Sequence, residues 1–293
     1  MGTILYYGRS IDNTLLAGLS AISSVQANST EQTKARLQWL LDYCITHPDA
    51  RIRYQASQMI LYIHSDASYL SEAGAKSRVG GYFYLGDKQD KMLNGAILVI
   101  SSIIKHVMSS AAEAEVGGLF HNAKEGTIIR TTLQEMGHPQ PPTMIYTDNS
   151  TANKIANDTC KQQRSRAMDM RYYWLQDRVK QKQFKVHWKP GITNLADYPS
   201  KHHAPIHHQR MRPIYLHTKE SKWLNTSQLA GRLAPTVRGC VKDPQSLTKG
   251  RLSLTGDRHR GSQTGPLSSR YPTANGYLGR QAGDTPANIG ISS

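Results

Sequence analysis

Short apolar runs and helical spacings alternate along residues 59–201 of the chain. Runs rich in β-branched and aromatic residues predict five strands, at 59–63, 78–85, 96–101, 143–147 and 184–188. The first three follow one another closely and predict an antiparallel meander. The last two alternate with helical patterns, so we expect a single mixed α/β sheet.

Apolar residues at helical spacing predict the helices that flank this sheet. The longest runs from about 111 to 136, between the third and fourth strands. Asn149 or Ser150 is expected to cap a short helix that ends near 157, and a basic helix follows over about 166–182. A last helix is expected to start near Asn194.

The two ends of the chain differ from this central region. Residues 1–58 carry helical patterns, at about 14–23 after an Asn13 cap and at 31–45. Gly, Ser, Thr, Pro and Arg dominate the last part of the chain, which shows no hydrophobic period and is expected to be disordered. The expected domains are a helical segment at 1–58, the α/β domain at 59–201, a basic His-rich extension at 202–239 and the tail at 240–293.

The overall charge of the chain indicates which class of binding partner to expect. The 293 residues carry a formal net charge of +15, which favours a polyanion, with nucleic acid as the first candidate; a generally basic surface is the alternative. Three widely spaced cysteines indicate a reducing compartment without a disulfide framework. The N-terminus has no signal-peptide pattern, and the longest apolar stretch, 95–104, is too short to span a bilayer, so we expect no membrane partner.

Four acidic residues occupy related positions in the predicted elements. Asp66 is expected on the first strand and Glu115 in the first turns of the long helix. Asp148 is expected just past the end of the fourth strand, and Asp197 in the first turn of the last helix, three residues after Asn194. The order of strands and helices can bring all four to one end of the sheet. Such oxygen ligands suit Mg²⁺ or Mn²⁺, and two ions about 4 Å apart support in-line phosphoryl displacement.

Each of these acids has a simpler interpretation. Asp66 can belong to a turn, Asp148 can cap the helix that follows it, and Asp197 can be a dipole-favoured acid in a first turn. Glu113 stands three residues after Ser110, the spacing of a capping box. We therefore assign Glu113 to the cap and Glu115 to the metal.

Six motifs in fixed order resemble the ribonuclease H domain of copia-type retrotransposon polyproteins. They are Ser65–Ser68 (SDAS), Lys76–Tyr82 (KSRVGGY), Ser109–Glu115 (SSAAEAE), Tyr146–Ala152 (YTDNSTA), Met168–Tyr173 (MDMRYY) and Asn194–Lys201 (NLADYPSK). The stretch 87–108 and Ala167 depart from the family pattern. Residues 2–58 are similar to the segment that links reverse transcriptase to this domain; no Tyr-x-Asp-Asp polymerase signature and no integrase segment is found.

The resemblance implies a ribonuclease H-like fold and a two-metal nuclease that cuts the RNA strand of an RNA–DNA hybrid. By position it implies Asp66, Glu115, Asp148 and Asp197 as catalytic acids that hold two Mg²⁺ or Mn²⁺ ions. A cytoplasmic or nuclear location follows from the same resemblance. The alternatives are a catalytically decayed fragment that only binds nucleic acid, and a subunit that pairs with a separate reverse-transcriptase chain through residues 2–58.

Cations and aromatic residues are interleaved over 154–189, a pattern suited to phosphate contacts that do not depend on sequence. The candidates for binding nucleic acid are Arg164, Arg166, Arg171 and Asn149, of which Asn149 could reach a 2′-hydroxyl. Trp174 and Trp188 are expected in the core rather than as stacking platforms. The histidines of 202–208 lack Cys or acidic partners, which favours a solvated basic segment over a zinc site.

Overall fold

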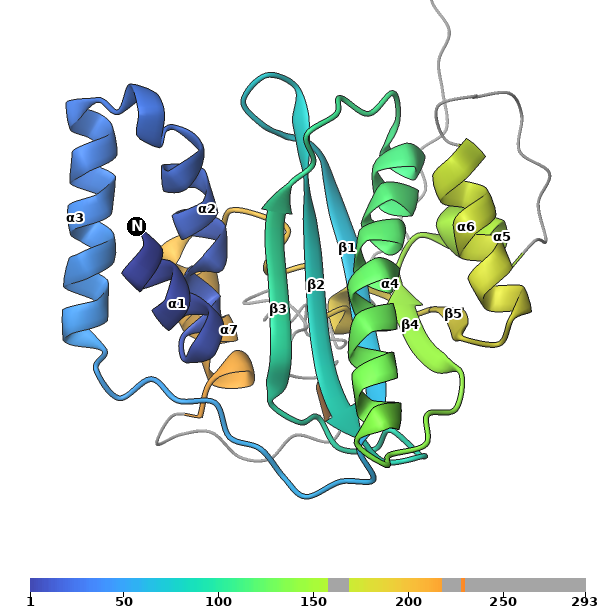
Figure 1. Cartoon of the computed structure of the whole chain (residues 1–293). Coiled ribbons are helices and arrows are strands. Elements are labelled where there is room, and N and C mark those ends of the chain that lie inside the picture. The colour runs from blue at the N-terminus through green and yellow to red at the C-terminus, as the bar shows by residue number, and fades with distance from the viewer. Residues whose placement is uncertain (158–168, 218–227, 230–293) are drawn as a thin grey trace, which may run out of the picture. The chain divides into compact units, whose positions relative to one another are not determined.

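Five strands form one mixed sheet in the order β3-β2-β1-β4-β5 (Figure 1). The computed structural model describes residues 1–157, 169–217 and 228–229, all within a unit that spans Met1–Val237. The strands are β1 (Ile60–Glu72), β2 (Lys76–Gly86), β3 (Ala96–Ile103), β4 (Thr143–Thr147) and β5 (Phe184–Trp188).

The pairing of the strands explains why β1 is central. β1 pairs antiparallel with β2, and β2 pairs antiparallel with β3, so the first three strands form the predicted meander. β4 lies parallel to β1 on its other side, and β5 lies parallel to β4. The predicted mixed five-stranded sheet with flanking helices is therefore confirmed. β1 extends well beyond the apolar run at 59–63, and Asp66 lies within it opposite Gly80, which confirms its expected place on the first strand.

Alternating side chains of the strands supply two hydrophobic clusters, because successive residues of a strand face opposite sides of the sheet. Leu61 and Ile63 of β1 belong to the first cluster, together with Val116 and Leu119 of α4. Figure 1 shows α4 lying across the sheet, with α5 and α6 beside it. The helices of this layer are α4 (Ala111–Glu135), α5 (Ser150–Ala156) and α6 (Asp169–Lys180).

Tyrosines dominate the second cluster, in which Tyr62, Tyr82 and Tyr84 pack with residues from both ends of the described chain. Leu16 comes from α2, and Met211 comes from α7. The helices concerned are α1 (Gly2–Ser10), α2 (Leu16–Ser24), α3 (Glu31–Thr46) and α7 (Pro205–Tyr215), with 3₁₀ turns at Asn13–Leu15, Gln26–Asn28 and Gly191–Thr193. None of the helices in these described ranges has the length and hydrophobicity to cross a bilayer.

Two sequence predictions about helix starts are wrong. Asp12, not Asn13, accepts the amide hydrogen of Thr14 at the first 3₁₀ turn. Residues 194–200 form turns instead of a helix, because Asn194 Oδ1 accepts the amide hydrogen of Ala196 and the turn is anchored to β1. A different helix, α7, begins at Pro205 and contains His207 and His208 of the histidine run. The tail at 240–293 lies outside the described residues.

Candidate active site

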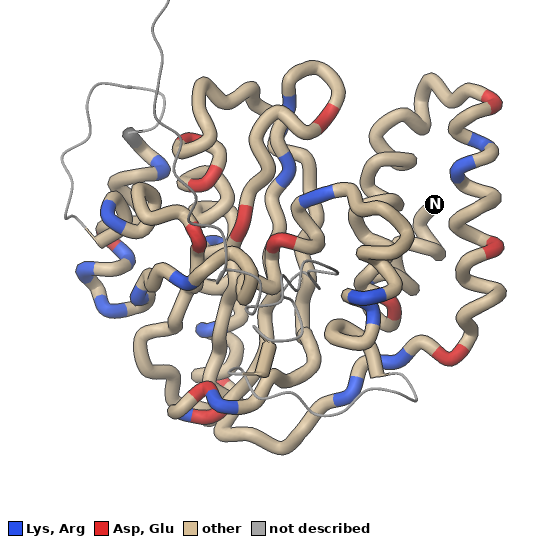
Figure 2. The backbone as a smooth tube through the Cα atoms, turned by 180° about the vertical axis from the view of Figure 1, so that it is seen from behind, with Lys and Arg blue, Asp and Glu red and all other residues tan. Residues whose placement is uncertain are grey.

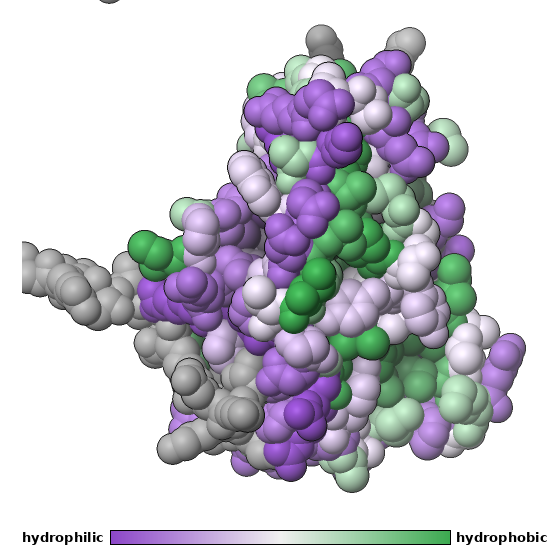
Figure 3. All heavy atoms as spheres, turned by 90° about the vertical axis from the view of Figure 1, so that its left-hand side faces the viewer, coloured by the Kyte–Doolittle hydropathy of each residue, from purple (hydrophilic) through white to green (hydrophobic). Residues whose placement is uncertain are grey.

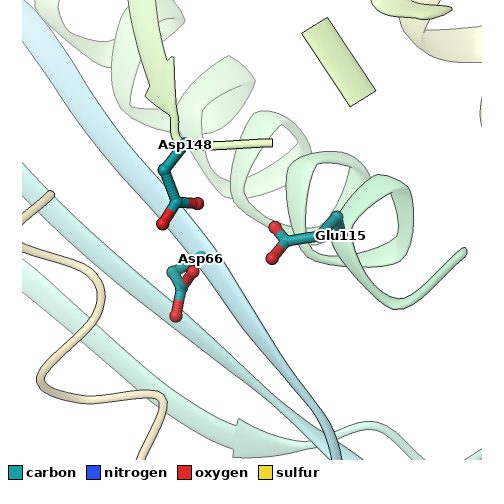
Figure 4. A group of neighbouring side chains, drawn as sticks. All are labelled: Asp66, Glu115 and Asp148. Carbon is teal, nitrogen blue, oxygen red and sulfur yellow. The ribbon is translucent and has the colours of Figure 1, made fainter. Parts of the chain in front are cut away.

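Three of the four predicted acids meet at one end of the sheet. Among the described residues, Asp66, Glu115 and Asp148 each offer a carboxylate oxygen within 4.8 Å of the other two. Figure 4 shows the three carboxylates turned toward one another from β1, α4 and the residue after β4. Three elements that are distant in the sequence thus place acidic oxygens around one point.

The capping of α4 separates the roles of its two glutamates. Ser110 Oγ accepts the amide hydrogen of Glu113, at 3.1 Å. The Glu113 carboxylate accepts the amide hydrogen of Ser109 at 2.7 Å and also its hydroxyl hydrogen. Glu113 is therefore used in the cap, as predicted, whereas Glu115 points to the other two acids. Glu115 Oε2 is buried without a hydrogen-bond partner among the described residues.

The Asp148 carboxylate is not used as a helix cap, because the next residue, Asn149, caps α5. Asn149 Oδ1 accepts the amide hydrogen of Ala152 at 2.9 Å, so the alternative in which Asp148 is the cap is wrong. The Asp148 carbonyl oxygen accepts a hydrogen bond from Trp188 Nε1 at 2.8 Å. Gly191 leaves room for its side chain, since a Cβ there would lie 2.6 Å from Asp148 Oδ2.

Burial and mutual repulsion make the three carboxylates hard to ionise together. Burial, aided by Asp66 and Asp148, raises the pKa of Glu115 to about 9. Burial also raises the pKa of Asp66 to about 6, against the opposing effects of Lys201 and Ser200. The pKa of Asp148 is raised mainly by burial. A divalent cation would reverse these shifts, because it favours the charged forms.

The turn at 194–201 is fastened to β1 by three consecutive residues of the strand. His64 Nδ1 accepts the amide hydrogen of Leu195 at 3.1 Å, and the Ser65 carbonyl oxygen accepts a hydrogen bond from Asn194 Nδ2 at 2.9 Å. Asp66 Oδ2 accepts the hydroxyl hydrogen of Ser200. Burial lowers the pKa of His64 to about 3, which keeps its ring neutral and its Nδ1 available as an acceptor.

Asp197 lies at the edge of the acidic group rather than within it. Its carboxylate pairs with the ammonium of Lys201, which also lies 3.7 Å from Asp66 Oδ2. Burial lowers the pKa of Lys201, but the adjacent acids outweigh that effect and the pKa is raised. Lys201 is therefore a charged link between Asp66 and the partly exposed Asp197, whose side chain is 34% accessible.

Replacing Glu115 by Gln is expected to change how stability depends on pH in EDTA. The raised pKa of Glu115 means that the unfolded chain loses this proton near the ordinary value of 4.5, whereas the folded chain keeps it up to about 9. The resulting stability is fully present below pH 4.5 and falls as pH rises through this window, at most by about 1.4 kcal/mol per pH unit. Glu115→Gln removes this fall, which urea unfolding at about pH 6 and about pH 8 measures.

The difference between wild type and Glu115→Gln measures the titration of Glu115 together with its repulsion by Asp66 and Asp148, because the titrating groups outside the acidic group are common to both proteins. Glu125→Gln on the same helix is the matched control and should keep the wild-type fall, since the Glu125 side chain is only partly buried and lies outside the acidic group. A parallel decline of wild type and Glu115→Gln between the two pH values would contradict the assignment of a buried, repelled carboxylate.

The predicted nucleic-acid contacts are only partly within the described chain. Arg164 and Arg166 lie outside it. Arg171 lies on α6, with its guanidinium 6.0 Å from the centre of the Phe120 ring on α4. Asn149 uses its oxygen as a helix cap, while its Nδ2 has no hydrogen-bond partner among the described residues. Figure 2 shows Lys and Arg gathered on the side formed by α5, α6 and β5.

The two tryptophans near this basic side differ. Trp174 packs partly buried against the first cluster, as predicted. Trp188 is 50% exposed, so its expected place in the core is wrong. It is the last residue of β5, and its indole nitrogen is held by the Asp148 carbonyl oxygen, which leaves the ring beside the acidic group.

Sequence reasoning assigned no role to several residues that shape the site. Lys201 and Ser200 contact Asp66, and Gly80 makes room for the turn that carries them. All three lie within motifs that carried the family resemblance, which was the available signal. The helix α7 was also missed, although Met211, Ile214 and Tyr215 have the spacing of a buried helical face.

Three of the solved structures to which the chain is similar are of ribonucleases H. The N-terminal RNase H domain of a Mycobacterium tuberculosis protein is 14% identical, with 48% of this chain and 91% of that chain covered and a TM-score of 0.36. An RNase H1 isolated from compost is 12% identical over 48% and 92% of the two chains, with a TM-score of 0.38. The same compost enzyme in complex with an RNA/DNA hybrid is 12% identical, with 47% of this chain and 90% of that chain covered and a TM-score of 0.35.

No family model matches the chain. A curated relative is the retrovirus-related Pol polyprotein from transposon TNT 1-94 of Nicotiana tabacum, 23% identical over 201 residues. The match includes 69% of this chain and spans 15% of the polyprotein. The chain is therefore similar to one part of a retrotransposon Pol polyprotein, which confirms the resemblance that its motifs indicated.

Proposed function

We propose that the chain is a metal-dependent endonuclease that hydrolyses the RNA strand of RNA–DNA hybrids. The meeting of Asp66, Glu115 and Asp148 is the observation that carries this proposal. Two of these acids are buried, the third is partly buried, and all three have raised pKa values. Such a group is costly for a fold unless a ligand compensates it, so a site of this kind is characteristic of function rather than of stability.

The residues present fit a divalent cation. Each carboxylate offers the hard oxygen donors that Mg²⁺ and Mn²⁺ prefer. Glu115 Oε2 is buried and has no hydrogen-bond partner among the described residues, so this oxygen is available as a ligand of the cation. Asp66, Glu115 and Asp148 would hold the cations, and Asp197 would complete the set from the edge. Two bound ions would activate water and stabilise the leaving oxygen during phosphodiester hydrolysis.

The protein's own groups would position the reacting phosphate. In hydrolysis, a water oxygen forms a bond to phosphorus while the bond from phosphorus to the leaving oxygen breaks and that oxygen takes up a proton. Ser200 and Lys201 fix the orientation of Asp66 through its Oδ2 atom. The positive charge of Lys201 would also attract the phosphate toward the acidic group.

The substrate class rests on the basic surface and on the resemblance to Pol polyproteins. Lys154, Arg171 and Lys185 come from α5, α6 and β5, the elements on the side that Figure 2 shows to be rich in cations. Contacts from such residues to phosphates position a duplex without reading its bases. The exposed Trp188 connects β5 with the acidic group, since its indole nitrogen donates a hydrogen bond to the Asp148 carbonyl oxygen at 2.8 Å.

Cleavage of an end-labelled hybrid by the full chain tests the proposal. We expect RNA-strand products with Mg²⁺ or Mn²⁺ and none with EDTA, while the DNA strand and double-stranded DNA stay intact. Binding of the hybrid without cutting in either metal, by protein with a folded circular dichroism spectrum, would support the decayed binding module instead. Equal cutting of both strands would contradict the substrate assignment.

A further inference from the structure

A groove beside the acidic group is built by residues from both ends of the described chain. Its volume is about 910 Å³, and α2, α3, the turn at Tyr198–His203 and α7 line it. Figure 3, seen from the side of α3, shows a band of hydrophobic side chains between hydrophilic ones. The groove contains none of Asp66, Glu115 and Asp148, so it is separate from the site described above.

Polar contacts of the Tyr43 side chain on α3 join two walls of the groove, α3 and α7. The Tyr43 hydroxyl accepts a hydrogen bond from Arg212 Nε at 2.7 Å and lies 3.0 Å from His208 Nε2. Both partners are on α7. Because these contacts fix α3 against α7, the groove is formed in the free protein and needs no ligand to open it.

The charge of the groove suits an anion. Its lining contains the permanent cations Arg36, Lys201 and Arg212 and one acid, Glu72. Glu72 is already paired with Arg78 at 2.7 Å. Lys201 is paired with Asp66 and Asp197, and Arg212 lies 4.0 Å from Asp12 Oδ2. Arg36 is exposed and makes no ion pair among the described residues, so its charge is available to a phosphate.

An exposed aromatic ring adds a surface for a base. Trp39 lines the groove and is 71% exposed, and α3, which carries it, buries none of its side chains. Because its indole stays exposed, Trp39 contributes little hydrophobic burial to the stability of the fold. Stacking on a nucleobase would shield it from water, and every base has a face that can stack, whatever its sequence.

We propose that this groove binds a single-stranded extension of the nucleic acid held at the acidic group, with a base on Trp39 and a phosphate at Arg36. Lys201 connects the two regions, since it lines the groove and lies 3.7 Å from Asp66 Oδ2. A strand that passes the acidic group can therefore continue into the groove. The inference rests on the proposed function for the location of that strand.

Fluorescence anisotropy in EDTA, where no cutting is expected, tests the groove. The probes are a blunt RNA–DNA hybrid and the same hybrid with a single-stranded extension of about six nucleotides. We expect the extension to tighten binding by about tenfold. Trp39→Ala should remove that gain and leave binding of the blunt hybrid unchanged, and Arg36→Gln should lower the salt dependence of extended-hybrid binding by about one unit of slope.

Matched controls are available on the same group of helices. Tyr6 is 73% exposed and does not line the groove, so Tyr6→Ala should behave as wild type. Lys34→Gln removes an exposed cation of α3 outside the groove lining and should leave the gain intact. Equal affinity for the two probes, or equal weakening of both by Trp39→Ala, would overturn the inference. Tighter binding of the extension by a protein that cuts nothing would reject the nuclease but keep the groove.

Discussion

Asp66→Asn and Asp148→Asn are each expected to lower the rate of hybrid cleavage by roughly a thousandfold, since a bound cation supplies several kcal/mol of transition-state stabilisation. Each change removes one negative charge while an oxygen and the shape of the side chain remain. The amide oxygen introduced by Asp66→Asn would still accept the hydroxyl hydrogen of Ser200. Initial rates on an end-labelled hybrid at saturating Mg²⁺ measure the effect.

Loss of folding would not explain such a result, because neutralising one of several crowded acids relieves repulsion. We expect both variants to be at least as stable as wild type in EDTA. Mg²⁺ binding by titration calorimetry should weaken in parallel with the rate. Asp42→Asn, on the exposed side of α3, is the matched control and should cut at the wild-type rate. Wild-type rates for Asp66→Asn would reject the active-site assignment.

The periodic elements of the sheet could be predicted from the sequence because local patterns determine them. The run at 143–147 and the helix from Ala111 follow the expected bounds closely, since period and caps agree there. β1 is longer than its apolar run because its second half carries His64, Ser65 and Asp66, polar residues that are satisfied by a turn far along the chain. No local pattern reveals such long-range hydrogen bonds.

In the acidic group, too, the features set by local patterns could be predicted, whereas those set by long-range contacts could not. The capping-box spacing separated Glu113 from Glu115 correctly, because a cap is a local device. The helix expected near Asn194 is absent since its amide groups bond to His64 and to the Asn194 side chain instead. The link from Lys201 to Asp66 could not be read from spacing, because these residues come together only through the turn.

That turn depends on a residue without a side chain, and Gly80→Ala is expected to destabilise the protein by about 3 kcal/mol, the cost of overpacking a closed contact. A Cβ on Gly80 would collide with the Ala196 carbonyl oxygen and lie 2.9 Å from Ser200 N. These are backbone atoms, which cannot rotate away. The turn must therefore move off β2, and Ser200 and Lys201 would leave Asp66. Urea unfolding measures the loss of stability.

A second glycine distinguishes this collision from a general effect of adding a methyl group. Gly18 lies in α2, and a Cβ there would meet nothing within 4 Å. Gly18→Ala should therefore stabilise the protein slightly, by about 0.5–1 kcal/mol, because alanine restricts the unfolded chain. Because the turn carries Asp197 and Lys201, Gly80→Ala should also reduce hybrid cleavage under conditions where it remains folded. Unchanged stability and cleavage in Gly80→Ala would show that the turn does not need close contact with β2 to orient Asp66.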